Sequence, residues 1–153
     1  MGLFSGIGNA PIFDRGTYFQ PNGKYRLKVI KLLAKDTRNS GLAFIAEFEV
    51  LESNHAEDPI GSKRTWFQSL TKKDIGYPAV KEFMMYLLAI ERHDKEAFQE
   101  FEQNLEAILE DATSFEGADS DHPMHGDEIC LETVSILTKD KKDFTRHNWS
   151  IAK

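Results

Sequence analysis

The chain has 153 residues and is short of several features that mark particular classes of protein. It has one cysteine, Cys130, which excludes an internal disulfide framework and is compatible with a reducing compartment. No apolar run approaches the roughly 18 residues needed to cross a bilayer. The first residues have neither a basic segment nor the long apolar core of a secretory signal. We therefore expect a cytoplasmic protein with no membrane contact.

Sequence patterns of common enzyme classes are also missing. There is no glycine-rich phosphate-binding loop, no paired-histidine zinc motif and no nucleophile elbow. His122 and His125 lie near several carboxylates, but Pro123 and Gly126 interrupt the stretch. Because no second pair of ligands is near in sequence, we expect a solvated polar loop here and no metal site. Cys130 lies in a strand-like run and is interpreted as a buried, inert thiol. We expect no enzyme and no cofactor.

Charge is unevenly distributed along the chain, whose net charge is −6. Residues 1–90 have 12 Lys and Arg against 9 Asp and Glu, a net charge of +3. Residues 91–128 have 2 against 13, a net charge of −11, and residues 129–153 have 5 against 3, a net charge of +2. The negative net charge by itself argues against nucleic acid as a partner. The basic segments at residues 1–90 and 129–153 are compatible with one.

Hydrophobic periodicity predicts three strands, a helical region and two last strands. The predicted strands are 24–33, 42–51, 63–70, 128–138 and 144–151, and the predicted helices begin at Pro78 and after a capping Asp94. A polar turn is predicted between the first two strands, at residues 34–41. This order indicates an α+β, mainly β fold: a five-stranded OB-like barrel with an acidic helical insertion between strands 3 and 4. We expect one domain over residues 1–153, with an irregular N-terminal arm at 1–22 and the insertion at 78–127.

Two segments mix cations with large aromatic side chains, the combination that binds single-stranded nucleic acid. In the terminal hairpin, Phe144 shares a face with polar residues, whereas Trp149 is expected in the core. In the third strand, Trp66 alternates with Arg64 and is expected to be exposed for stacking, with Phe67 pointing inward. Each segment has a second interpretation as a solvated surface.

The predicted DNA-binding residues lie on the first and third strands and in the two loops expected to line the groove. They are Lys24, Arg26, Lys35, Arg38, Arg64, Trp66, Lys139, Lys141, Lys142, Phe144 and Arg146, with Tyr25 or Trp149 as further stacking candidates. The cations would hold phosphates, so affinity should fall steeply as salt rises.

The segments GKYRLKVIKL, FIAEFEVLES and TKDKKDFTRHNWS together resemble bacteriophage-type single-stranded DNA-binding proteins with OB-fold cores. The resemblance covers residues 15–70 and 128–151. It implies sequence-independent binding of single-stranded DNA in replication, recombination or repair, in the cytoplasm of a host cell. Such proteins commonly recruit partners through an acidic C-terminal tail, whereas this chain carries its acidic charge internally. The acidic insertion is therefore the expected contact for replication or recombination proteins.

Two other classes of function remain open. A viral structural or assembly protein on the same small barrel would bury these aromatic side chains at a protein interface. A metal-dependent hydrolase would need ordered ligands around His122 and His125. The acidic helix is likewise either a glutamate-coated surface helix packed on the barrel, or a partner surface whose charge keeps DNA on the opposite side.

Overall fold

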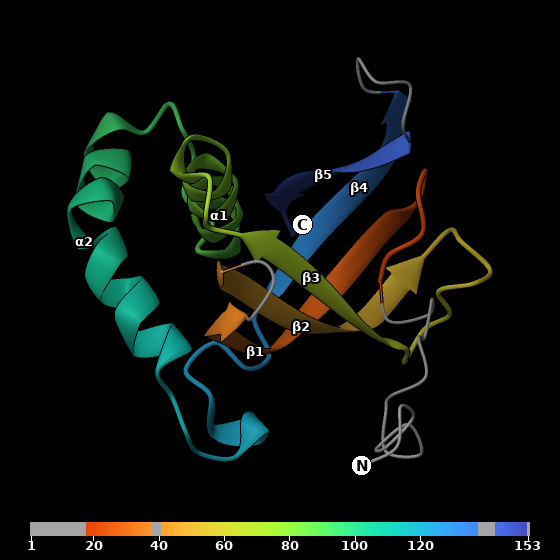
Figure 1. The fold of residues 1–153 in the computed structure, drawn as a ribbon, viewed down its shortest axis with the longest axis horizontal. Coiled ribbons are helices and arrows are strands. Elements are labelled where there is room, and N and C mark those ends of the chain that lie inside the picture. The colour runs from red at the N-terminus through yellow and green to blue at the C-terminus, as the bar shows by residue number, and fades with distance from the viewer. Residues whose placement is uncertain (1–17, 38–40, 138–142, 153) are drawn as a thin grey trace, which may run out of the picture.

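The computed structural model describes residues 18–37, 41–137 and 143–152. The elements, shown in Figure 1, are β1 (Lys24–Thr37), β2 (Gly41–Ser53), β3 (Lys63–Ser69), α1 (Lys73–Leu87), α2 (Lys95–Thr113), the short 3₁₀ helix η3 (Asp119–Asp121), β4 (Glu128–Leu137) and β5 (Asp143–Ile151). The mainly β class and the order of elements are confirmed. Both predicted bounds of the polar turn at residues 34–41 are wrong. Strand β1 continues to Thr37, and β2 already begins at Gly41.

All five strands form one antiparallel sheet in the order β3-β2-β1-β4-β5. In a flat sheet, four spacings of about 4.8 Å would hold the edge strands about 19 Å apart. The ring centroids of Trp66 on β3 and Trp149 on β5 are only 5.0 Å apart, so the sheet curls until its edges approach. Within the described residues no strand pairing joins β3 to β5, so the sheet is not a closed barrel.

The core lies on the inner face of the curl. Along β2 the inward positions Phe44, Ala46 and Phe48 are at most 2% exposed, as the alternation of apolar residues predicts. Phe83 of α1 packs edge-on against Trp149, with ring centroids 4.8 Å apart, and tilts against Trp66 at 5.2 Å. Helix α1 therefore fills the space between the two edge strands (Figure 1).

Helix α1 begins at Lys73, five residues before the predicted start, and Pro78 lies inside it. A Cβ atom on Gly76 would come within 2.3 Å of the carbonyl oxygen of Ser69. Only glycine allows the first turn to pack this closely on the end of β3. The close approach couples the start of α1 to the sheet.

Helix α2 lies at the outer side of α1 in Figure 1, and it contacts β1 of the sheet. It begins as predicted, with the Asp94 side chain accepting a hydrogen bond from the backbone N–H of Ala97 at 3.2 Å. Its apolar stripe is centred on the buried Phe101, while its glutamates are exposed. No helix in the described ranges has both the length and the apolar character that crossing a membrane requires.

The described end of the predicted N-terminal arm is packed against the fold. Phe19 is 6% exposed, and its ring centroid lies 5.0 Å from that of Tyr25 and 5.9 Å from that of Phe48. Residues 18–22 are irregular in backbone, as predicted, but they contribute an aromatic side chain to the core.

Candidate nucleic-acid interface

The two faces of β3 are reversed relative to the prediction. Trp66 is 4% exposed and Arg64 is 9% exposed, whereas Phe67 is 37% exposed. Trp66 lies opposite Ala46, and Arg64 lies opposite Phe48, on the inner face of the sheet. Directly opposed residues of an antiparallel pair share a face, so this register places both side chains inward. The predictions that Trp66 stacks on bases from an exposed position and that Phe67 points inward are therefore wrong.

Arg64 is held in a buried polar network and is not a free phosphate ligand. Its Nε donates to Oδ1 of Asp58 at 2.6 Å, and its Nη2 donates to the carbonyl oxygen of Glu57 at 2.9 Å. Asp58 is fully buried and also accepts hydrogen bonds from the Tyr25 hydroxyl and from the backbone N–H of Gln20. Burial, and then the neighbouring Asp58, raise the pKa of Tyr25. The network removes Arg64 and Tyr25 from the set of available contacts.

The basic stripe along the outer face of β1 is largely neutralised by carboxylates. The ion pairs are Arg26 with Glu128 at 2.7 Å, Lys28 with Glu49 at 3.1 Å, and Lys31 with both Glu47 and Asp119 at 3.3 Å. Each carboxylate would compete with a phosphate for its cation. Of the predicted DNA-binding residues in this stripe, Arg26 is paired in this way, whereas Lys24 is exposed and unpaired in the described part of the chain.

Other cations are exposed and free. Within the described residues, those with no ion pair are Lys24, Lys35, Lys63, Lys72, Lys73, Arg92, Lys95 and Arg146. Lys35 lies near the end of β1, and Lys63 begins β3. Lys72 and Lys73 follow β3 at the start of α1. Four of these eight free cations therefore border the three-stranded part of the sheet formed by β1, β2 and β3.

An apolar row crosses the outer face of those three strands. Leu33 of β1 lies opposite Ile45 of β2, and Ile45 lies opposite Phe67 of β3. Leu33 and Ile45 are half-buried, and Phe67 is the exposed aromatic side chain of the row. Sequence reasoning missed this row because it placed Phe67 inward. The alternation of inward and outward side chains along β2 places Ile45 on the outer face. With the register of β2 and β3, it would have placed Phe67 there too.

The remaining predicted residues divide between two ends of the sheet. β4 pairs with the first residues of β1, and Lys24 lies opposite Glu132. The hairpin formed by the end of β4 and the start of β5 therefore lies far from the end of β1 that carries Lys35. Arg146 is exposed on β5, opposite Val134. The side chain of Phe144 and the predicted loop cations Arg38, Lys139, Lys141 and Lys142 lie outside the described residues.

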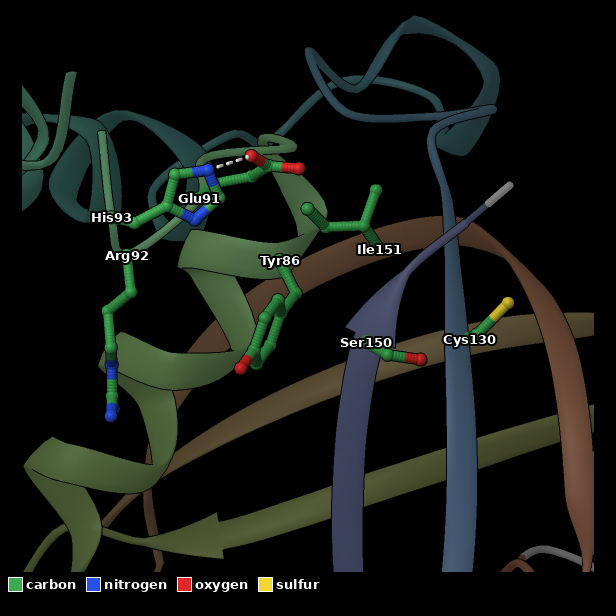
Figure 2. A pocket seen from close by; sticks show the side chains of 7 residues that line it. All are labelled: Tyr86, Glu91, Arg92, His93, Cys130, Ser150 and Ile151. Carbon is green, nitrogen blue, oxygen red and sulfur yellow. Dashed lines mark ion pairs between the residues drawn. The ribbon is translucent and has the colours of Figure 1, made fainter.

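A hollow of about 600 Å³ lies beside the end of α1 and the strands β4 and β5. Its lining residues are Tyr86, Glu91, Arg92, His93, Cys130, Ser150 and Ile151. In Figure 2 the Arg92 side chain lies on the α1 side of the hollow, and Ser150 and Cys130 lie on the two strands at its other side. His93 pairs with Glu91 at 2.8 Å. The polar groups do not converge on one point, and Cys130, predicted to be buried, is half-buried at this wall.

His122 and His125 anchor their loop to neighbouring elements, so the expectation of a solvated loop is wrong for both rings. His122 is 5% exposed. Its Nδ1 accepts a hydrogen bond from the backbone N–H of Met124 at 3.1 Å, and its Nε2 lies 2.7 Å from the carbonyl oxygen of Ala112 and 3.3 Å from the backbone nitrogen of Leu32. His125 Nδ1 donates to the carbonyl oxygen of Ile30 at 3.0 Å, at a bulge in β1. No three or more metal-ligating side chains gather in the part of the chain described.

The side chain of His147 is expected to make the stability of the fold sensitive to acid. It lies among Phe19, Trp66 and Trp149, and burial lowers its pKa to about 4 from the ordinary 6.5. Between these values the unfolded chain binds the proton and the folded chain does not, so stability falls as pH drops from about 6.5 to about 4, by up to about 3 kcal/mol. Urea unfolding across this range should show a steeper loss for the natural protein than for His147→Phe. Parallel pH profiles would contradict the assignment.

The outer face of β1, β2 and β3 is thus the strongest candidate interface, with one exposed aromatic ring on an apolar row and free lysines around it. Stacking on the ring and attraction to the lysines are interactions that a single-stranded polyanion with flat bases can use together. Compared with known proteins, the chain matches no protein-family model, and it matches no curated protein in sequence.

Proposed function

We propose that this protein binds single-stranded DNA without sequence preference on the outer face of β1, β2 and β3, in bacteriophage DNA replication, recombination or repair. The observation that carries the proposal is the exposed Phe67 on an apolar row, with Lys35 and Lys63 free on the same face. In this proposal the curled sheet is the partly open barrel of an OB fold. That fold binds oligonucleotides on its strand 2–3 face and in the loops after strands 1 and 4.

The spacing of these groups suits an extended strand. The row from Leu33 to Phe67 spans two strand separations, about 10 Å, and Lys63 lies four residues from Phe67, about 13 Å along β3. A base stacked on Phe67 would leave its neighbouring phosphates free to approach lysines on either side. The proposed contact does not depend on Arg38, Lys139, Lys141 or Lys142, which lie outside the described residues.

The distribution of charge favours the β3 side of this face. Residues 91–128 carry a net charge of −11, and α2, which lies within them, stands beyond α1 (Figure 1). The paired stripe of β1 offers little net charge. The acidic region also reaches the outer face of β1, where Asp119 pairs with Lys31 at 3.3 Å and Glu116 lines a hollow with Leu33. A polyanion is therefore repelled from this edge of the face and attracted to the side of Phe67 and the unpaired Lys63.

Replacing Phe67 by alanine should weaken binding of a fluorescently labelled oligothymidine by about 5- to 150-fold, which is a stacking loss of about 1–3 kcal/mol. Fluorescence anisotropy at low and moderate salt is the measurement. A labelled oligonucleotide is the right probe because Trp66 and Trp149 are buried and do not face the proposed ligand. Tyr18→Ala is the control, since Tyr18 is an aromatic residue that is 46% exposed and precedes β1, at the opposite end of that strand from Lys35.

The charge contribution is measured by Lys35→Ala combined with Lys63→Ala. The plot of log affinity against log salt should become shallower by about 1.4, because each lost phosphate contact removes about 0.7 from a single-strand slope. Lys28→Ala should change the slope less, because Lys28 is paired with Glu49. Equal losses in the Phe67 and Tyr18 variants would place the ligand elsewhere. A natural protein that binds no oligonucleotide at low salt would overturn the proposal and favour a structural or assembly role.

A further inference from the structure

The start of α1 carries an exposed group of side chains that the fold does not bury. This helix-start patch consists of Lys72, Lys73, Ile75 and Tyr77. Ile75 is 58% exposed and Tyr77 is 50% exposed, and the ammonium nitrogen of Lys73 lies 5.7 Å from the centroid of the Tyr77 ring. Neither lysine has an ion pair within the described residues, and Asp74 is the single acid between them and Tyr77.

The helix-start patch adjoins the face proposed to bind DNA. Gly76 packs on the carbonyl oxygen of Ser69, the last residue of β3, so the first turn of α1 is seated on the end of that strand. A Cβ on Gly41, the first residue of β2, would come within 2.4 Å of the Thr71 side chain. The segment before α1 therefore lies against the β1–β2 end of the sheet, where Lys35 is also located.

Packing of α1 does not use this patch. The residues that α1 buries against the core, Val80, Phe83, Met84 and Leu87, come from its later turns. An exposed aromatic ring with two free ammonium groups is complementary to a phosphate backbone that carries stackable bases. An acidic peptide would use the lysines but would gain less from the ring.

We propose that the helix-start patch is a second contact for the DNA strand that crosses β1, β2 and β3, which rests on the function proposed above. Tyr77 stacks on a base, and Lys72 and Lys73 hold the adjoining phosphates. The strand then runs from Phe67, over the end of the sheet, to α1. An oligonucleotide too short to reach both Phe67 and Tyr77 gains nothing from the second contact.

The charge test compares two double variants that remove the same charge from opposite ends of α1. Lys72→Ala with Lys73→Ala removes the patch cations, and Arg92→Ala with Lys95→Ala removes two exposed, unpaired cations beyond the other end of the helix. Fifteen helical residues separate the two sites by about 22 Å. The patch variant should bind an oligothymidine of about 20 nucleotides at least about 5-fold more weakly, with a salt slope shallower by about 1.4, and the control should match the natural protein.

The stacking test compares Tyr77→Ala with Tyr77→Phe. Tyr77→Ala should lose at least about 5-fold in affinity for the oligothymidine of about 20 nucleotides and little for one of about 5, while Tyr77→Phe retains both affinities. Thermal unfolding of each variant checks that the fold is intact. If the natural protein binds DNA but the patch variants match their controls, this inference is wrong and the proposed function stands. If the natural protein binds no oligonucleotide, both are wrong.

Discussion

Replacing Trp66 by alanine is expected to lower the free energy of unfolding by about 3–5 kcal/mol, because it empties a large volume in the core. The ring of Trp66 contacts those of Phe44, Phe83 and Trp149, with centroids 5.9, 5.2 and 5.0 Å away. Those contacts join both edge strands to α1, so the cavity cannot close without moving an element. Urea unfolding followed by circular dichroism measures the loss.

The adjacent residue provides the control. Phe67→Ala should change the free energy of unfolding by less than about 1 kcal/mol, because its side chain is exposed on the outer face. The pair of variants separates stability from binding: Trp66 supports the fold, and Phe67 is proposed to contact the ligand. A stable Trp66→Ala protein beside an unstable Phe67→Ala protein would show that the faces of β3 are assigned the wrong way round.

The Asp58→Ala substitution is expected to destabilise the protein by about 3–5 kcal/mol, because it leaves the buried guanidinium of Arg64 without its counter-charge. Asp58 is fully buried and accepts hydrogen bonds from Arg64, from the Tyr25 hydroxyl and from the backbone N–H of Gln20. One substitution therefore releases β1, β3 and the N-terminal segment together. Urea unfolding at neutral pH is the measurement.

A surface ion pair is the comparison for this buried one. Glu49→Ala breaks the pair with Lys28 at 3.1 Å on the outer face and should cost at most about 1 kcal/mol. Similar losses in the Asp58 and Glu49 variants would show that Arg64 reaches water when its partner is removed, and that the network contributes little to stability.

The sequence predicted most of the elements, because their signals are local. The alternation in residues 42–51 predicted the inward face of β2, and Asp94 predicted the start of α2. The start of α1 was missed, because Pro78 suggested a first turn, whereas the packing of Gly76 on β3 allows the helix to begin at Lys73. Strand order and curl were beyond local reasoning, since they depend on contacts such as Trp66 with Trp149.

The candidate site shows the same division. The sequence by itself determined that basic and acidic residues are segregated along the chain and that aromatic residues lie near the cations in sequence. Only the tertiary structure decided which of these side chains are available. Arg64 forms an ion pair with Asp58, and Arg26 forms one with Glu128. The register of β3 against β2 places Phe67 on the outer face, where Trp66 had been predicted. A side chain's availability depends on its strand register and on its partners in space, and neither is encoded in the local pattern of the sequence.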